Sequence, residues 1–334
     1  MERPAEIRFA SNVSEFSDAQ QQEIAQFSSN SGVMRFDNVT YQNVTENQFI
    51  KNKKLGRGTF GHVFEATFAN NGKKVAVKEC IARMDSGNSV LLGWAKRMGR
   101  ELEINSMSHQ CENLLKCHGY IVTPEFHVFL YLEVMPMSLG QLSRAAGKIS
   151  DRFVGKFAID VITGMHYLRQ LKMVHRDLKP DNMLIDKFGT VKLADFGFMG
   201  YVMEMSVVSN TTGTIIYTAP EVFTTDPRNS PWKSSVDVWS FAISMLELLR
   251  GEHPLEDQQS QFLSIMQVIN ADIPELTKKE APAIYDLINS CLNRDPSRRP
   301  RIKDLPKHAA IKRLEEDENV KEELREWLSQ YLSL

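Results

Sequence analysis

The chain has 334 residues, of which 42% are hydrophobic and 25% are charged, and its formal net charge is −2. This length allows one large domain or two modest ones, with a sizeable core. The near-neutral charge gives no global basic field, which argues against nucleic acid or an anionic membrane surface as a partner.

The cysteine content and the N-terminus predict a protein of the cytoplasm or the nucleus. The four cysteines are sparse, and Cys111 and Cys117 lack the spacing of metal ligands, so we expect reduced thiols. The first residues, "MERPAEIRFASN", contain no apolar signal core, and no uncharged apolar run approaches about 18 residues. We therefore expect neither a signal peptide nor a membrane span.

Residues 1–47 are rich in Ser, Gln, Asn and Glu, with only scattered Phe and Ile. A segment of this composition buries too little apolar surface to offset the conformational entropy that ordering removes. We therefore expect a flexible N-terminal extension before the folded part of the chain.

The next stretch, "GRGTFGHV", places Gly56, Gly58 and Gly61 in a G-x-G-x-x-G pattern. A dinucleotide-binding fingerprint opens a helix, whereas "HVFEATF" continues here as a strand, so we expect the glycines at the tip of a β-hairpin. Glycine lets backbone N–H groups approach phosphate oxygens without a Cβ in the way. A plain glycine-rich turn is the alternative interpretation.

The strand predicted from "KKVAVKEC" directs Ala76 and Lys78 to one face, because side chains alternate along a strand. A small residue there lets a flat base lie against the strand while the Lys reaches phosphates. An acid on the next helix, predicted from "WAKRMGRELEINSM", would fix the ammonium group in an ion pair. Glu101 is the first candidate for this acid and Glu103 the second.

A polar stretch, "VHRDLKPDNMLI", lies between apolar flanks in the second half of the chain. Asp177 can accept a proton from a hydroxyl nucleophile, Lys179 can stabilise charge on a transferred group, and Asn182 can offer a neutral oxygen to Mg²⁺. The following "MLIDKFGTVKL" predicts a hairpin that brings Asp195 beside Asp177 as a charged Mg²⁺ ligand. Each acid alone is more often a cap or a surface charge, but the ordered set favours chemistry.

Helices are predicted for much of the second half. "RFVGKFAIDVITGMHYL" has one apolar face, and "SVDVWSFAISMLELL" is apolar nearly all round, which indicates a buried helix. Residues 313–334 are predicted to form an amphipathic helix, which either packs on its own lobe or binds a partner. Together the elements predict an α+β fold with a cleft between two lobes, a small strand-rich lobe at 48–135 with one helix and a larger helical lobe at 136–312.

Six motifs occur in a characteristic order over about residues 49–310: "GRGTFGHV", "VAVK", "HRDLKPDN", "DFG", "APE" and "DVWS". By these motifs the chain resembles the eukaryotic protein kinases, and Lys179 resembles the Ser/Thr type. The resemblance implies ATP and Mg²⁺ as cofactors, with Lys78 on the phosphates and Glu101 as its helix partner. It also implies Asp177 as the catalytic base, and Asn182 and Asp195 on the metal.

The resemblance further implies an adenine site and three structural contacts. The side chains that would surround the base are Leu55, Val63, Ala76 and Leu184, and the backbone of Glu133 and Met135 would hydrogen-bond it. Leu132 falls at the position that guards the back of this pocket. Glu221 is expected to pair with Arg299, and Asp237 to anchor the catalytic loop from the buried helix.

Finer similarity is to the MAP kinase kinases, carried by "RELEINSMSHQCENLLKCHGY", "YLEVMPMSLGQL" and "LINSCLNRDPSRRPRIKDLPKH". Three features depart from that family. Asp181 stands where Ser is usual, Met199 and Gly200 replace an expected "SG", and the N-terminal residues lack a basic-plus-hydrophobic docking motif. The resemblance implies a monomeric relay that phosphorylates a MAP kinase on Ser or Thr, or also on Tyr.

Two alternatives stay open, a Ser/Thr kinase of the same broad group that does not act on MAP kinases and a catalytically dead scaffold. The four intact residues that argue against a scaffold are Lys78, Asp177, Asn182 and Asp195. Arg176 precedes the predicted base, and its guanidinium requires an anionic partner. A phosphate placed on the activation segment by an upstream kinase would supply one. The candidate positions are Ser206, Ser209, Thr211 and Thr212.

Overall fold

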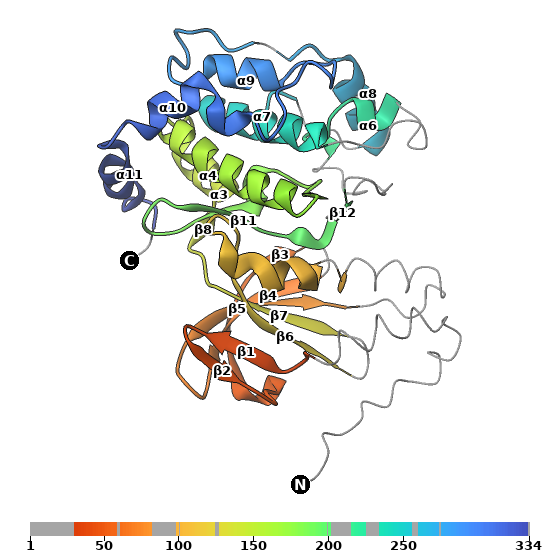
Figure 1. The fold of residues 1–334 in the computed structure, drawn as a ribbon, viewed down its shortest axis with the longest axis vertical. Helices are drawn as coiled ribbons and strands as arrows, with labels where there is room; N and C mark the ends of the chain where they lie inside the picture. The colour runs from red at the N-terminus through yellow and green to blue at the C-terminus, as the bar shows by residue number, and fades with distance from the viewer. Residues whose placement is uncertain are drawn as a thin grey trace. The chain divides into compact units, whose positions relative to one another are not determined.

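The computed structural model describes residues 30–58, 61–81, 98–99, 101–123, 127–198, 200–201, 215–224, 234–255, 260–273 and 275–332 (Figure 1). The chain divides into two compact units. The first unit comprises Met1–Gln110 and Leu115–Val134, and the second comprises Cys111–Leu114 and Met135–Leu334. The division falls between a strand-rich part and a mainly helical part of the chain, which is the α+β class that the sequence predicts.

The described part of the first unit contains a sheet of seven antiparallel strands. In spatial order its strands are β2 (Val39–Tyr41), β1 (Val33–Phe36), β6 (Cys117–Val122), β7 (Val128–Leu132), β5 (Lys74–Cys80), β4 (Gly61–Phe68) and β3 (Phe49–Gly58). Residues 101–107 are helical and run into the short 3-10 helix η4 (Ser108–Gln110), and a further 3-10 helix, η2 (Glu46–Gln48), precedes β3. The predicted strands "HVFEATF" and "KKVAVKEC" correspond to β4 and β5.

The structure differs from the prediction of a flexible segment for residues 30–47. β1 pairs with β2 and with β6, so that these two strands extend one edge of the sheet. Met34, Phe36 and Val44 are buried in an aromatic core, where Phe36 stacks on Phe68 with ring centroids 5.1 Å apart. Composition alone underestimates the order of this segment. A few apolar side chains are enough to order it, because the sheet supplies the surface that they cover.

The second unit is built around a pair of long helices. Its described α-helices are α3 (Leu139–Ala146), α4 (Asp151–Gln170), α6 (Glu221–Thr224), α7 (Ser235–Arg250), α8 (Gln261–Asn270), α9 (Tyr285–Cys291), α10 (Ala309–Glu315) and α11 (Val320–Leu328). The predicted face of α4 is buried, with Phe157, Val161, Met165 and Leu168 all inside. α7 is buried nearly all round, also as predicted, and Figure 1 shows it lying between α4 and α9.

Short strands in the second unit flank and position the polar loop that contains Asp177. β10 (Met183–Ile185) pairs with β11 (Val191–Leu193) and with β8 (Met137–Ser138), and β9 (Met173–Val174) pairs with β12 (Gly200–Tyr201). The hairpin predicted from "MLIDKFGTVKL" is therefore confirmed. Asp186 shapes its turn by accepting hydrogen bonds from the backbone of Phe188 (2.8 Å) and Thr190 (2.9 Å), and Gly189 takes a positive φ of 84°.

The C-terminal segment is two helices, α10 and α11, and not the single helix predicted for 313–334. Residues 316–319 separate them, and Asp317 in this connection accepts two hydrogen bonds from Arg152 of α4. The apolar face of α11 packs on the second unit itself, with Trp327 against Phe153 at a centroid distance of 5.2 Å. Packing on its own lobe, the first of the two interpretations, is confirmed for the described residues.

Replacing Gly189 by Ala is expected to weaken the packing of α11 against the turn between β10 and β11. A Cβ on Gly189 would lie 2.8 Å from Leu324 Cδ2 of α11, and the left-handed backbone already disfavours a side chain by about 1–2 kcal/mol. We expect the free energy of unfolding to fall by about 1–3 kcal/mol in denaturant titrations. Gly72→Ala is the control, because Gly72 has a similar φ of 71° and an added Cβ there would meet no described atom within 4 Å. If both variants lost the same free energy of unfolding, the contact between residue 189 and Leu324 would not contribute to the effect.

Among the described helices, none combines the length and the apolar character needed to cross a bilayer. All four cysteines are free and buried, in line with the expected reduced thiols.

Candidate active site

The first part of the candidate site is an ion pair inside the first unit. Lys78 lies on β5, and its Nζ is 2.5 Å from Oε1 of Glu101 in the helical segment 101–107. Both side chains are almost fully buried, with 5% and 2% of their surface exposed, which strengthens the attraction between the charges. Glu103 is exposed, so the structure places the first candidate and not the second against the Lys.

The three glycines of the G-x-G-x-x-G pattern differ in whether the surrounding structure requires a glycine. Gly58 and Gly61 are direct partners across the β3–β4 hairpin, as predicted. A Cβ on Gly61 would lie 2.0 Å from the backbone oxygen of Glu79, so the close approach of β5 excludes any side chain there. Gly56 has open space where its Cβ would be, so no neighbouring atom in the described part of the chain requires a glycine at that position.

The second unit holds the polar loop that follows β9. The Asp177 carboxylate is buried and accepts hydrogen bonds from Lys179 Nζ, at 3.0 Å and 3.2 Å, and from Asn182 Nδ2 at 2.8 Å. Asn182 also donates to the backbone oxygen of Asp177 at 2.8 Å. The structure therefore brings together the three residues that the sequence singled out in this loop, and it fixes the orientation of the carboxylate from two sides.

The environment of Asp177 raises the pKa of its carboxyl group above the ordinary value. Burial is the main cause, and the charge of Asp195 acts in the same direction. The Lys179 ammonium opposes both by stabilising the carboxylate. A carboxylate with a raised pKa is a stronger base than an exposed one, which is the property that proton abstraction from a hydroxyl needs.

The backbone of the loop is held from a distant helix. Asp237 of α7 accepts hydrogen bonds from the backbone N–H groups of His175 (2.7 Å) and Arg176 (2.8 Å). Arg176 has a φ of 67°, a conformation that a residue with a side chain rarely adopts, and the Asp237 bond helps to hold it there. The anchoring role expected for Asp237 is confirmed.

His175 is a positioning residue that the sequence reasoning did not assign. Its ring is fully buried, and Nε2 lies 3.1 Å from the backbone oxygen of Ala194. The backbone N–H of Ala194 donates to the oxygen of Asn182 at 2.9 Å. These two bonds tie the polar loop to the strand end that precedes Asp195. The sequence signal for this role was the position of His175 directly after the apolar Val174, in "VHRD".

The residues proposed for Mg²⁺ have a suitable donor chemistry. Because the Asn182 amide nitrogen is engaged twice with Asp177, its amide oxygen faces away from that residue. Asp195, with a φ of 62°, is close enough for its charge to disfavour ionisation of Asp177. A divalent cation would offset this repulsion, and carboxylate and amide oxygens are the ligands that Mg²⁺ prefers.

Glu221 and Arg299 form the predicted pair. The Arg299 guanidinium donates to both carboxylate oxygens of Glu221, at 2.6 Å and 2.8 Å, and lies 5.0 Å from the ring centroid of Trp239 on α7. Its remaining donors bond to backbone oxygens, among them that of Asn293 at 2.7 Å. The Arg299 side chain is fully buried and Glu221 is partly buried, and this structural ion pair fixes the start of α6 on the helical core.

The residues expected around adenine belong to both units. Val63 and Lys78 are partners between β4 and β5, and Ala76 and Leu132 are partners between β5 and β7. The remaining members are Leu55, which is exposed on β3, Glu133, which follows β7, and Met135 and Leu184, which belong to the second unit. Their role in adenine binding stays a prediction. The candidate phosphorylation positions Ser206, Ser209, Thr211 and Thr212 lie outside the described residues.

Comparison with known proteins identifies the family. A model of the protein kinase domain matches residues 49–311. Human dual specificity mitogen-activated protein kinase kinase 7 is 31% identical over 78% of this chain, which spans 62% of the length of that relative. The Caenorhabditis elegans dual specificity mitogen-activated protein kinase kinase mek-1 is 30% identical over 85% of this chain and 78% of its own. The chain therefore belongs to the protein kinase family, with relatives among the dual specificity MAP kinase kinases.

Proposed function

We propose that the protein is a MAP kinase kinase-like relay, which transfers the γ-phosphoryl group of ATP to Ser or Thr hydroxyls, and also to Tyr, of a MAP kinase. The observation that carries the proposal is the buried Asp177 carboxylate, oriented by Lys179 and Asn182. The identity of 30–31% with dual specificity MAP kinase kinases supports the substrate class. Each of these assignments is open to a direct test.

In the proposed reaction, the substrate hydroxyl oxygen attacks the γ-phosphorus while the bond from that phosphorus to the bridging β-phosphate oxygen breaks. The hydroxyl proton passes to the carboxylate of Asp177, and ADP leaves with the former bridging oxygen. Lys179 stabilises charge on the transferred group, and Lys78, held by Glu101, holds the remaining phosphates. Little bond chemistry falls to the protein, so the residues act by positioning and by charge neutralisation.

Asn182 and Asp195 are the residues that would hold Mg²⁺, which supplies charge neutralisation at the phosphates when it is bound. Asp237 and His175 act indirectly. They keep the loop and the segment before Asp195 in one arrangement, through bonds of 2.7 Å to the backbone of His175 and 3.1 Å from its ring to Ala194.

Activation is proposed to depend on a phosphate at one or two of four positions, Ser206, Ser209, Thr211 and Thr212. Arg176 precedes the base, and its guanidinium can donate two charge-assisted hydrogen bonds to one phosphate. Its backbone is already fixed by Asp237, so a phosphate bound to its side chain would act on a rigid part of the loop. An upstream kinase is the expected source of this phosphate.

A second candidate function, a Ser/Thr kinase acting on other proteins, is favoured by one local feature. Asp181 stands where the MAP kinase kinases usually have Ser, and its carboxylate accepts hydrogen bonds from Arg144 (2.8 Å) and Ser138 (3.3 Å) of the α3 region. These bonds give the loop a different attachment to α3 from the one that a Ser would make. The two candidate functions differ only in the protein substrate.

The test is phosphorylation of a panel of inactive MAP kinases by the full chain, with each product mapped by mass spectrometry to Thr or Tyr. We expect at least one MAP kinase to be modified far faster than casein, and Asp177→Asn to be slower by about 10²–10⁴-fold. Modification of casein without any MAP kinase would establish the second candidate instead. Measurable incorporation that is equal in the wild-type protein and Asp177→Asn would refute both.

A further inference from the structure

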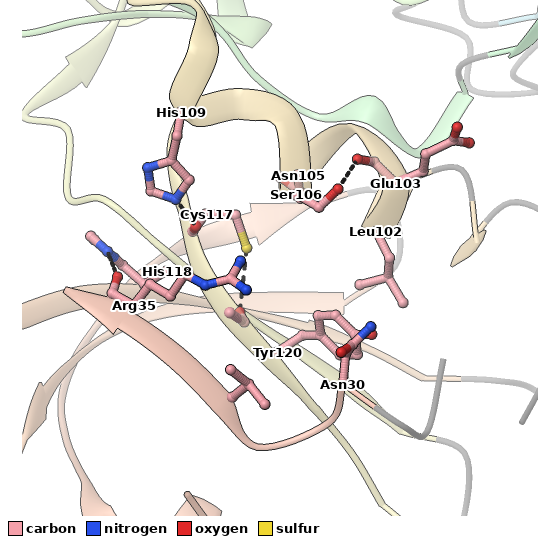
Figure 2. Close-up of a pocket in the computed structure, with 12 residues that line it drawn as sticks. Asn30, Arg35, Leu102, Glu103, Asn105, Ser106, His109, Cys117, His118 and Tyr120 are labelled. Carbon is pink, nitrogen blue, oxygen red and sulfur yellow. Dashed lines mark hydrogen bonds between the residues drawn. The ribbon is translucent and has the colours of Figure 1, made fainter. Parts of the chain in front are cut away.

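A cavity of about 350 Å³ lies in the first unit, between β1, β6 and the helical segment that carries Glu101 (Figure 2). Its volume falls within the range of sites that hold small molecules, about 300–1,000 Å³. None of the residues assigned to phosphoryl transfer lines it. Among the residues that line the cavity are Val33, Arg35, Leu102, Glu103, Asn105 and Tyr120.

Asn105 provides a buried hydrogen-bond donor that has no acceptor among the described residues. Only 3% of the residue is exposed, and its Nδ2 makes no hydrogen bond to them. Its backbone oxygen, in contrast, accepts from Ser108 Oγ at 2.8 Å. Buried amide groups are nearly always satisfied, so an orphaned donor in the wall of a cavity indicates an acceptor that enters the cavity.

Arg35 provides a charged donor at the same cavity. Its backbone oxygen lies 3.0 Å from Nδ1 of His118, and no described carboxylate lies within ion-pair distance of its guanidinium. Figure 2 shows the Arg35 side chain extending from β1 among the side chains that line the cavity. A guanidinium presents a planar pair of N–H groups that match a carboxylate or a phosphate.

The charge balance favours a single negative charge on the ligand. Glu103 also lines the cavity, but Figure 2 shows its carboxylate turned away from the Arg35 side chain. Two histidines also line the cavity, and one ring nitrogen of each lies at hydrogen-bond distance from a backbone oxygen, His109 Nε2 at 2.8 Å from Cys117 O and His118 Nδ1 at 3.0 Å from Arg35 O. Arg35 is the one Arg or Lys among the described residues that line the cavity, so the single charge of a carboxylate matches it, whereas a phosphate dianion would keep one charge unpaired.

Three side chains form an apolar part of the wall, beside the polar residues that line the remainder. Leu102 is buried on the helical segment, Val33 begins β1, and the ring of Tyr120 faces in from β6. Flat apolar groups pack well against such a surface, and their burial supplies the driving force that a lone ion pair in a partly exposed site lacks.

We propose that this cavity binds a small aromatic carboxylate, with its carboxylate on Arg35 and a ligand oxygen accepting from Asn105 Nδ2. Asn105 lies four residues after Glu101, so both project from the same side of the helix. A ligand that bonds Asn105 therefore stabilises the helix that presents Glu101 to Lys78. Binding at this cavity does not depend on which protein the kinase phosphorylates.

The probe is indole-3-acetate, titrated into the full chain and followed by calorimetry and by the melting temperature. We expect saturable 1:1 binding and a rise in melting temperature with ligand concentration. Arg35→Gln should weaken binding about 10-fold or more, because it removes a charged hydrogen bond. Lys53→Gln is the matched control, since it removes one positive charge from β3 outside the cavity, and it should leave binding unchanged.

Two further measurements distinguish ligand binding from a purely structural role of Arg35 and Asn105. Indole-3-acetamide, which has the same shape without the charge, should bind about 10-fold more weakly than the acetate. Asn105→Leu should lose binding and keep the wild-type melting temperature without ligand, because the amide nitrogen it removes has no partner among the described residues. Equal binding of acetate and acetamide, or of the wild-type protein and Arg35→Gln, would overturn the proposal, as would the absence of saturable binding.

Discussion

Replacing Asp177 by Asn is expected to lower the rate of phosphoryl transfer about 10²–10⁴-fold, the usual contribution of general acid–base catalysis. The amide has nearly the same shape and can still accept the hydrogen bond that Lys179 donates at 3.0 Å. It cannot take up the hydroxyl proton. The measurement is the initial rate of label transfer from ATP to a protein substrate at saturating ATP, with melting temperatures to confirm that the variant folds.

Asp181→Asn is the matched control for this prediction. Asp181 lies four residues further along the same loop, but its side chain is half exposed and pairs with Arg144 on the surface of α3. A surface pair contributes about 0–1 kcal/mol, so this variant should keep its fold and most of its rate. If both variants lost activity equally, the loop as a whole, and not proton transfer to Asp177, would explain the effect.

Replacing Phe36 by Ala is expected to lower the free energy of unfolding by about 3–5 kcal/mol. The ring is only 2% exposed, and it lies between Phe68, at 5.1 Å between centroids, and His118, at 4.6 Å. Its removal opens a cavity between β1 and the rest of the sheet. Chemical denaturation, followed by far-UV circular dichroism, measures the loss.

Val39→Ala provides the comparison for this variant. Val39 lies on β2 in the same segment but is 52% exposed, so its truncation should change stability by less than about 0.5 kcal/mol. A similarly small effect for Phe36→Ala would mean that β1 and β2 do not belong to the cooperative core. The flexible extension predicted for residues 1–47 would then hold in solution.

The sequence alone was sufficient for features that depend on neighbouring residues. The hairpin at residues 183–193 follows from two short apolar runs around a turn with Gly189, and the buried face of α4 follows from its helical period. The set Asp177, Lys179 and Asn182 could be singled out because all three side chains come from one short loop. Local spacing determines how close they can come, so the structure brings them together as expected.

Only the tertiary structure determined the features that depend on contacts between distant parts of the chain. Glu101 and Glu103 are equivalent by spacing, and only the packing of their helix turns Glu101 towards Lys78. The sheet surface offered by β6 ordered residues 33–41, although their own composition predicts disorder. In the loop, a hydrogen bond to Asp237, 62 residues beyond His175 along the chain, holds the backbone in place. Such contacts are set by how whole elements pack, and no pattern within a single element records them.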